Sequence, residues 1–312
     1  MRILFCDETF PAARPLLQAR LPHDEVLASP PQQLPEALAG VDVVIPLMAR
    51  VDAALMDAGR FRLVQQWGAG IEGVDLAAAA ERGIWVANVP SAATGNADSV
   101  AEHAVLLMLA LLRQLPRAQA SVRDGLLGTP MGRTLAGCTV CLFGLGGIAR
   151  ALARRLHPWD VRLIGIGRRP VPPPEPALDR YFPFAARQAA LAETDILVLC
   201  LPLTAETAGV IDTAALAALP RGAYLVNVAR GPLIDYAALR TALATGHLAG
   251  AALDVFWQEP IPPDDPLLAL PNLLATPHVA GVTERSYRGI ADAVAANIER
   301  LRRGEPPLHR VV

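Results

Sequence analysis

The stretch from Thr139 to Leu156 constrains the fold of this chain more than any other segment. It joins the apolar run TVCLF to the helical pattern IARALARRL through a glycine-rich turn, GLGG. An apolar run of this kind, followed by glycines and then a helical pattern, predicts a strand, a tight turn and a helix. Further apolar runs alternate with helical stretches, and we expect strands at Arg2–Cys6, Val41–Leu47, Leu63–Trp67, Trp85–Asn88, Thr139–Phe143, Val161–Ile166, Ile196–Leu201, Tyr224–Val228, Ala251–Phe256 and Leu273–Thr276. This alternation predicts an α/β fold with parallel sheets covered on both faces.

Composition narrows the class of protein further. With 312 residues, 53% of them hydrophobic, the chain is long enough for two domains with well-packed cores. Its net charge is only −2, which argues against nucleic acid or an anionic membrane as the main partner. The longest wholly apolar run, Ala104–Leu112, is too short to span a bilayer, and the start of the chain does not resemble a signal peptide. We therefore expect a cytoplasmic protein.

Two long helices are predicted. One covers Ala97–Leu115 and ends before Pro116; it is apolar around most of its circumference, so it must be buried in a core or against another subunit. The other covers Glu284–Arg303 and stops at Gly304. Glu102 and His103 are of catalytic type, but their position within the first helix favours a structural role.

The glycine turn is of the type that binds dinucleotides. Gly144, Gly146 and Ala149 fit the pattern G-x-G-x-x-[G/A] between a strand and a helix. The first glycine allows the tight turn, and the second lets the backbone approach a pyrophosphate. Gly147 and Ile148 then open the helix, whose N-terminal N–H groups can bind the phosphates.

The end of the following strand indicates which dinucleotide is bound. An acidic residue normally stands there to bind the ribose 2′-hydroxyl of NAD. This chain has Gly167 at that position, followed by Arg168 and Arg169, whose guanidinium groups can bind a 2′-phosphate. We therefore expect NADP(H) to be preferred, with NAD(H) also possible. The proline-rich stretch 171–176 is expected to form a stiff connector beside this site.

Three separate segments supply an arginine, a glutamate and a histidine: Arg230 in NVARGPLID, Glu259 in DVFWQEP and His278 in TPHVAG. A guanidinium can bind a carboxylate through two oxygens. An imidazole can exchange a proton with a carbonyl oxygen, and a neighbouring carboxylate favours its protonated form. Together with a dinucleotide, these groups suit hydride transfer to a 2-oxo acid, and we expect no metal ion in the site.

With these segments, the chain resembles the D-isomer-specific 2-hydroxyacid dehydrogenase family over nearly its whole length. The segments that carry the resemblance are VDVVIPLMAR, WGAGIEGVDLAAAAERGIWVANVP, SVAEHAVLLMLALLR, GLGGIARALARRL, CLPLTAETAGVI, NVARGPLIDYAAL, GAALDVFWQEP and TPHVAG. The resemblance implies that Arg230 binds the substrate, that His278 is the acid and base, and that Glu259 holds the imidazole.

The resemblance also implies further site residues and a domain organisation. Backbone N–H groups at Ala69 and Gly70 would bind the substrate carboxylate. Three residues would lie near the cofactor: Thr204, Asn227 and Asp254. A Rossmann-type doubly wound parallel sheet would occupy residues 98–282, and a smaller flavodoxin-like α/β substrate domain would comprise 1–97 and 283–312. The helix Ala97–Leu115 would lie in the two-fold interface of a homodimer.

The leading interpretation is an NADP(H)-linked oxidoreductase of a small 2-oxo or D-2-hydroxy acid, such as glyoxylate or hydroxypyruvate. An NAD-dependent phosphoglycerate-type dehydrogenase is the alternative within enzymes; the missing acidic residue at Gly167 disfavours it, and we expect no regulatory domain after Val312. Formate dehydrogenases have glutamine in place of the catalytic glutamate, so Glu259 disfavours that activity. A non-catalytic dinucleotide-sensing binding protein remains possible because a fold does not prove a function.

Overall fold

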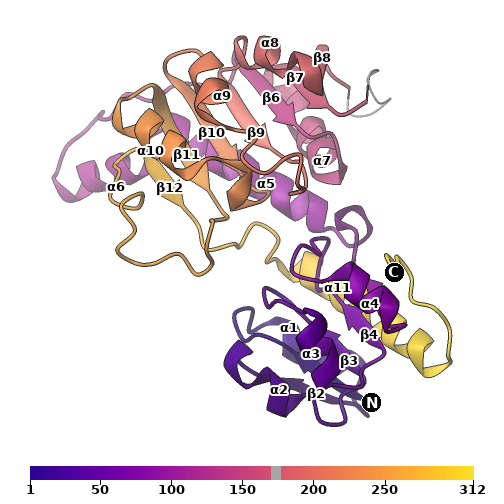
Figure 1. Ribbon diagram of the computed structural model, residues 1–312. Helices are drawn as coiled ribbons and strands as arrows, with labels where there is room; N and C mark the ends of the chain where they lie inside the picture. The colour runs from indigo at the N-terminus through magenta and orange to yellow at the C-terminus, as the bar shows by residue number, and fades with distance from the viewer. Residues whose placement is uncertain (170–176) are drawn as a thin grey trace. The chain divides into compact units, whose positions relative to one another are not determined.

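The chain divides into two compact units in a computed structural model that describes residues 1–169 and 177–312 (Figure 1). Unit 1 contains Met1–Asn96 and Val282–Val312, and unit 2 contains Ala97–Gly281. The proline-rich stretch 171–176 lies outside the described residues. The assignment of the substrate to the first unit and the dinucleotide to the second stays a prediction.

Within its described residues, unit 1 forms a five-stranded parallel sheet in the order β2-β1-β3-β4-β5. This is the order of a flavodoxin-like domain, which the family resemblance implies. The strands are β1 (Arg2–Phe5), β2 (Glu25–Ala28), β3 (Val43–Ile45), β4 (Leu63–Gln65) and β5 (Trp85–Ala87). The helices are α1 (Ala13–Arg20), α2 (Leu34–Ala37), α3 (Ala53–Ala58), α4 (Leu76–Glu81) and α11 (Glu284–Arg302), with short 3₁₀ turns η1 (Pro31–Gln33) and η2 (Ser91–Ala93).

Side chains alternate between two cores along each strand of unit 1. In β1, Ile3 and Phe5 face the core that includes α1 and α11, whereas Leu4 faces the core that includes α2, α3 and α4. The predicted second long helix corresponds to α11, which begins at the side-chain cap of Thr283 and is followed by Gly304 at φ 73°.

Unit 2 forms a seven-stranded parallel sheet from its described residues, in the order β12-β11-β10-β9-β6-β7-β8. Read from β8, this is the Rossmann order with one additional strand. The strands are β6 (Thr139–Phe143), β7 (Arg162–Gly167), β8 (Arg180–Pro183), β9 (Ile196–Leu199), β10 (Ala223–Asn227), β11 (Leu248–Leu253) and β12 (Leu273–Ala275). The helices are α5 (Asn96–Leu112), α6 (Leu115–Arg123), α7 (Gly147–Leu156), α8 (Arg187–Leu191), α9 (Thr213–Ala218) and α10 (Tyr236–Ala244), with η3 (His157–Trp159), η4 (Phe184–Ala186) and η5 (Gly231–Leu233).

Both faces of the second sheet are covered by helices. Along β6, Val140 and Leu142 pack in the core that contains α5 and α7, while Cys141 and Phe143 pack in the core of α8, α9 and α10. Because each face has its own helical layer, the strands are buried on both sides, as their continuous apolar sequences predict.

The first long helix differs from the prediction at its end. It stops at Leu112, and the chain turns at Gln114, which has a left-handed backbone with φ 49°. A new helix, α6, starts at Leu115 with Pro116 in its first turn. Proline is tolerated there because the first turn needs no N–H donor at that position. The single helix expected from Ala97 to Leu115 is therefore wrong beyond Leu112.

The structure has two strands that the sequence does not predict, β2 and β8. Each lies at an edge of its sheet. An edge strand is less buried than a central one, so its apolar pattern is weaker. In β8, Arg180 is exposed and Pro183 closes the strand. Neither feature is typical of a central strand.

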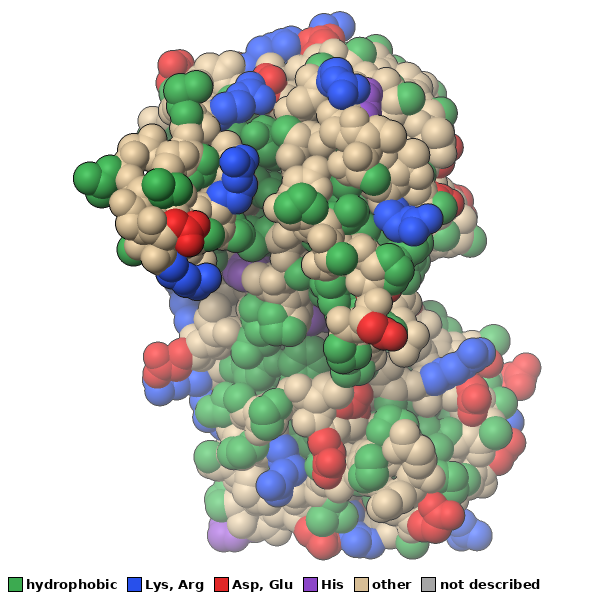
Figure 2. Space-filling model, turned by 90° about the vertical axis from the view of Figure 1, so that its left-hand side faces the viewer, with side chains coloured by type: hydrophobic (Ala, Val, Ile, Leu, Met, Phe, Trp, Pro, Cys, Tyr) green, Lys and Arg blue, Asp and Glu red, His purple; other side chains and the backbone are tan. Residues whose placement is uncertain are grey.

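Charged side chains are dispersed over the surface. Figure 2 shows basic and acidic groups interspersed on the face in view, which agrees with the net charge of −2. No helix within the described ranges 1–169 and 177–312 is long and apolar enough to cross a membrane.

Candidate active site

The three predicted catalytic residues follow three neighbouring strands of unit 2. Arg230 comes after β10, Glu259 after β11 and His278 after β12. These strands are adjacent and parallel, so their carboxyl ends meet at one edge of the sheet. Ligands of doubly wound sheets bind at this edge.

The structure brings Glu259 and His278 into direct contact. Oε2 of Glu259 lies 2.6 Å from Nδ1 of His278, and Oε1 accepts a hydrogen bond of 2.8 Å from the backbone N–H of Phe256. Their side chains are 15% and 27% exposed, so the pair is partly shielded from water. Burial raises the pKa of Glu259, but the His278 hydrogen bond and charge, the Phe256 N–H and the Arg230 charge outweigh it and lower the pKa below its ordinary value. Glu259 is therefore a carboxylate at neutral pH.

The loop that carries Arg230 is fixed by the side chain of Asn227. This side chain is fully buried; its Nδ2 donates to the carbonyl of Arg230 at 2.8 Å, and its Oδ1 accepts from the N–H of Ala229 at 3.0 Å. Asn227 thus shapes the Arg230 loop, and its proximity to a cofactor stays a prediction.

Gly231 explains how two of the site loops come so close. A Cβ atom on this residue would lie 2.1 Å from the carbonyl carbon of Phe256. The loop after β10 and the loop after β11 are therefore in backbone contact, which only glycine permits. The Arg230 and Glu259 segments are adjacent for this reason.

Asp254 is 1% exposed, and its carboxylate accepts hydrogen bonds from other groups of the same chain. It accepts hydrogen bonds from Val279 N and Ala280 N, both at 2.9 Å, and from the hydroxyl of Thr276 at 2.6 Å. Proximity of Asp254 to a nicotinamide stays a prediction, and the hydrogen bonds of its carboxylate are with the loop that carries His278.

The glycine turn fits a bound pyrophosphate. Gly144 has φ 92°, and a Cβ on it would lie 2.6 Å from the backbone nitrogen of Leu201. A Cβ on Gly146 would meet no atom within 4 Å, so the backbone at the start of α7 is open to a ligand. The turn lies between β6 and β9, where the strand order reverses, and Gly147 and Ile148 form the first turn of α7. This is the switch point at which Rossmann-type sheets bind dinucleotides.

The side chain of Tyr181 lies against Gly167, the position at which the motif normally has an acidic residue. A Cβ on Gly167 would lie 2.9 Å from the ring and from the hydroxyl of Tyr181, which comes from the unpredicted strand β8. The Tyr181 hydroxyl donates to the carbonyl of Arg169, and burial raises the pKa of this phenol, although the Arg169 charge partly opposes the rise. No pattern in the sequence linked Tyr181 to this position because β8 was not recognised as a strand.

Thr204 follows β9 at the same edge and has an acidic neighbour that the sequence analysis did not single out. A hydrogen bond with Thr204 and the charge of Arg168 are among the causes that lower the pKa of Glu206 below its ordinary value. The carboxylate of Glu206 is therefore close enough to interact with the charge of Arg168.

In unit 1, the predicted carboxylate-binding loop follows β4. Gly68 has φ 138° and its carbonyl accepts from Val89 N at 2.8 Å, while Asn88 Nδ2 donates to the carbonyl of Ala69 at 2.8 Å. These contacts use carbonyl groups on the loop, and Ala69 and Gly70 stay predicted N–H donors to a substrate.

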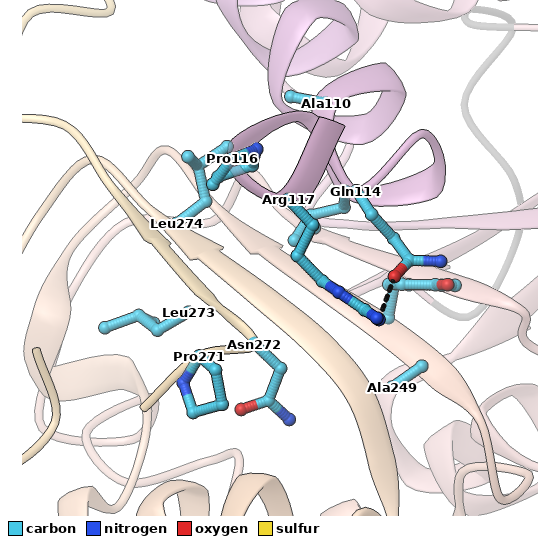
Figure 3. A pocket seen from close by; sticks show the side chains of 11 residues that line it. Ala110, Gln114, Pro116, Arg117, Ala249, Pro271, Asn272, Leu273 and Leu274 are labelled. Atoms are coloured by element: carbon cyan, nitrogen blue, oxygen red, sulfur yellow. Dashed lines mark hydrogen bonds between the residues drawn. The ribbon is translucent and has the colours of Figure 1, made fainter. Parts of the chain in front are cut away.

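A pocket of about 380 Å³ in unit 2 lies away from these residues (Figure 3). It is lined by Ala110, Leu111, Gln114, Pro116, Arg117, Tyr224, Ala249, Pro271, Asn272, Leu273 and Leu274. Arg117 donates to Gln114 at 2.6 Å, and none of the predicted catalytic residues lines the pocket. It does not form part of the catalytic arrangement.

Comparison with known proteins identifies the family. Residues 105–280 match the model of the D-isomer specific 2-hydroxyacid dehydrogenase NAD-binding domain. This chain belongs to the D-isomer-specific 2-hydroxyacid dehydrogenase family. It is therefore a D-2-hydroxyacid dehydrogenase that uses a nicotinamide dinucleotide, as the sequence predicts.

Relatives of this D-2-hydroxyacid dehydrogenase differ in substrate. It is 36% identical over 271 residues to the glyoxylate reductase of Thermofilum pendens, covering 84% of this chain and 78% of that protein. It is 34% identical over 280 residues to the D-3-phosphoglycerate dehydrogenase of Archaeoglobus fulgidus, with 85% of this chain but only 50% of that protein covered. Among solved structures, the NADPH-dependent glyoxylate/hydroxypyruvate reductase of Sinorhizobium meliloti, in complex with NADP and malonate, aligns with a TM-score of 0.86 and 33% identity over 100% of this chain and 96% of that one.

Proposed function

We propose that this dehydrogenase is an NADP(H)-linked reductase of a small 2-oxo acid, glyoxylate or hydroxypyruvate, and forms the 2-hydroxy acid, in the D configuration where the product is chiral. The Glu259–His278 hydrogen bond of 2.6 Å is the observation that carries the proposal. Glyoxylate and hydroxypyruvate reductases among the relatives and solved structures support this substrate class.

Each side chain has a defined task in the proposed reaction. Glu259 engages Nδ1 of His278 and stabilises the imidazolium, so the other ring nitrogen gives a proton to the carbonyl oxygen during reduction. Arg230 binds the substrate carboxylate through its planar guanidinium. A bound nicotinamide supplies the hydride chemistry. Oxidation of the hydroxy acid reverses the proton transfer, and His278 then acts as the base.

The residues at the end of β7 favour NADP(H) over NAD(H). Gly167 has no carboxylate, and Tyr181 fills the space that one would need. Arg168 and Arg169 follow, and Gly144, Gly146, Gly147 and Ile148 would hold the pyrophosphate. A charge-assisted hydrogen bond is worth roughly 1.5–3 kcal/mol, or about one to two powers of ten in binding. We expect NADPH to exceed NADH by at least about tenfold in kcat/KM.

The test is oxidation of NADPH and NADH by the purified protein with glyoxylate, hydroxypyruvate, pyruvate and 3-phosphohydroxypyruvate. Rapid turnover of the first two with NADPH, and a D-configured product from hydroxypyruvate, would support the proposal. Preference for 3-phosphohydroxypyruvate with NADH would instead indicate a phosphoglycerate-type dehydrogenase. The variant Arg168→Ala/Arg169→Ala should lose far more activity with NADPH than with NADH; equal losses would remove the arginines from cofactor selection.

We also propose that the enzyme is a homodimer. Helix α5 is largely buried inside unit 2, but Leu106 on it and several apolar side chains just beyond it are exposed. The exposed apolar side chains of this region are Leu106, Leu115, Val122, Leu126, Leu127 and Met131, with Leu127 97% and Met131 89% exposed. Exposed apolar side chains gathered in one region of the chain are normally covered by a partner, and the adjoining pocket offers a second copy a place to bind.

A further inference from the structure

The backbone of the catalytic histidine is in an uncommon conformation. His278 has φ 54°, in the left-handed region that few residues other than glycine adopt. Its N–H donates to the carbonyl oxygens of Asp254, at 2.8 Å, and Thr276, at 3.0 Å. Strained conformations at functional sites persist only when neighbouring structure holds them.

The carboxylate of Asp254 holds the residues that follow. Val279 N and Ala280 N donate to its two oxygens, and Thr276 donates its hydroxyl hydrogen to the same group. The backbone and the side chain of Asp254 therefore fix three consecutive N–H groups, those of His278, Val279 and Ala280.

A second histidine contacts this assembly from helix α5. Nε2 of His103 lies 3.0 Å from Oγ1 of Thr276 and 3.5 Å from Oδ1 of Asp254, and its side chain is 13% exposed. The single hydroxyl hydrogen of Thr276 is donated to Asp254. The hydrogen between Thr276 and His103 must then come from the imidazole, so Nε2 of His103 carries a proton.

We propose that His103 is a positioning residue for the reaction. Its Nε2–H holds the Thr276 hydroxyl, and through Thr276 and Asp254 it maintains the left-handed backbone that presents His278. This inference rests on the proposed function only in that His278 is the proton donor. The sequence neighbour Glu102 bonds instead to Arg155 at 2.8 Å on the exposed side of α5, so it provides a matched control.

The kinetic test compares His103→Leu, which removes the donor, with His103→Gln, which keeps a donor on a side chain of similar reach. We expect His103→Leu to lower kcat for 2-oxo acid reduction by about tenfold, because a buried hydrogen bond is lost, with unchanged NADPH affinity. His103→Gln should restore most of kcat, and the control Glu102→Gln should match wild type. Thr276→Val should reproduce the loss, and combining it with His103→Leu should add little, because both changes break one chain of contacts.

A second readout does not depend on activity. Hydrogen exchange at the amides of His278, Val279 and Ala280 should be faster in His103→Leu and Thr276→Val, and close to wild type in His103→Gln and Glu102→Gln. If the wild type reduced no 2-oxo acid, the proposed function would be wrong. The exchange rates of these amides would still test whether His103 positions the His278 loop. Unchanged exchange in both His103→Leu and Thr276→Val would overturn the inference, as would equal kinetic losses in His103→Leu and His103→Gln.

Discussion

Glu259 and His278, nineteen positions apart in sequence, meet through a hydrogen bond of 2.6 Å between Oε2 and Nδ1. They meet because β11 and β12 are adjacent parallel strands whose loops leave the same edge of the sheet. The lowered pKa of Glu259 keeps its charge opposite the imidazole at neutral pH. This arrangement places a carboxylate against one ring nitrogen of the proposed proton donor.

Glu259→Gln should move the pH profile of reduction. A neutral amide no longer stabilises the imidazolium, so less of the proton donor is present at pH 7–8. We expect kcat/KM for reduction to fall in that range and its profile to move to lower pH. Glu193→Gln, which alters an exposed ion pair with Arg162 and Arg180, is the control and should leave the profile in place. A profile unchanged by Glu259→Gln would show that the two side chains are not coupled.

Gly231→Ala should displace the loops of the site, although it adds only one methyl group. The added methyl group would lie 2.1 Å from the Phe256 carbonyl carbon, so one of the two loops must move. Overpacking of this kind costs about 1–3 kcal/mol. We expect a lower melting temperature together with a larger loss of kcat/KM, because Arg230 and Glu259 lie on the displaced loops. Calorimetry and kinetics on the same sample test this, and full activity in the variant would contradict the close loop contact.

Gly167→Asp alone should not produce an efficient NADH enzyme. Its side chain would collide with Tyr181, 2.9 Å from the Cβ position, so we expect loss of thermal stability. Adding Tyr181→Ala makes room, and the double variant should be more stable than the sum of the single changes predicts. It should also use NADH better than either single variant, because a carboxylate can then bind the ribose hydroxyls. A stable, NADH-preferring Gly167→Asp single variant would show that Tyr181 does not limit this position.

The proposed homodimer should depend on exposed apolar side chains beyond α5. Light scattering should give twice the monomer mass of 33.0 kDa. Leu127→Asp with Met131→Asp should yield a monomer, because charges would be buried in the interface. Leu308→Asp, at a half-exposed leucine of unit 1, is the control and should stay dimeric. A wild-type monomer at micromolar concentration would contradict the proposal.

The central strands, and the segments that carry the candidate catalytic residues, could be predicted because their signals are local and strong. Ile196–Leu199 and Thr139–Phe143 are continuous apolar runs, and the Arg230, Glu259 and His278 segments resemble one family. The edge strands β2 and β8 were missed because half-exposed strands lack that pattern. The contact of Tyr181 with Gly167 depends on strand pairing, so no local signal indicates it.

The contacts of His103 likewise have no local signal in the sequence. Its position in an apolar helix favours a structural role, and its contacts with Thr276 and Asp254 arise from residues more than 150 positions away. The end of α5 at Leu112 likewise depends on a left-handed turn at Gln114 that no strong local signal marks. The sequence thus names candidate residues for the chemistry, whereas tertiary packing determines what holds them.

The most direct test of the proposed reaction is kcat for NADPH-dependent glyoxylate reduction by wild type and His278→Asn. Asparagine tolerates the left-handed backbone at this position, so the substitution removes the proton donor with little added strain. We predict measurable turnover by the wild type, a kcat that is lower by roughly 100-fold or more in the variant, and unchanged NADPH binding. Near-normal turnover in His278→Asn would contradict it.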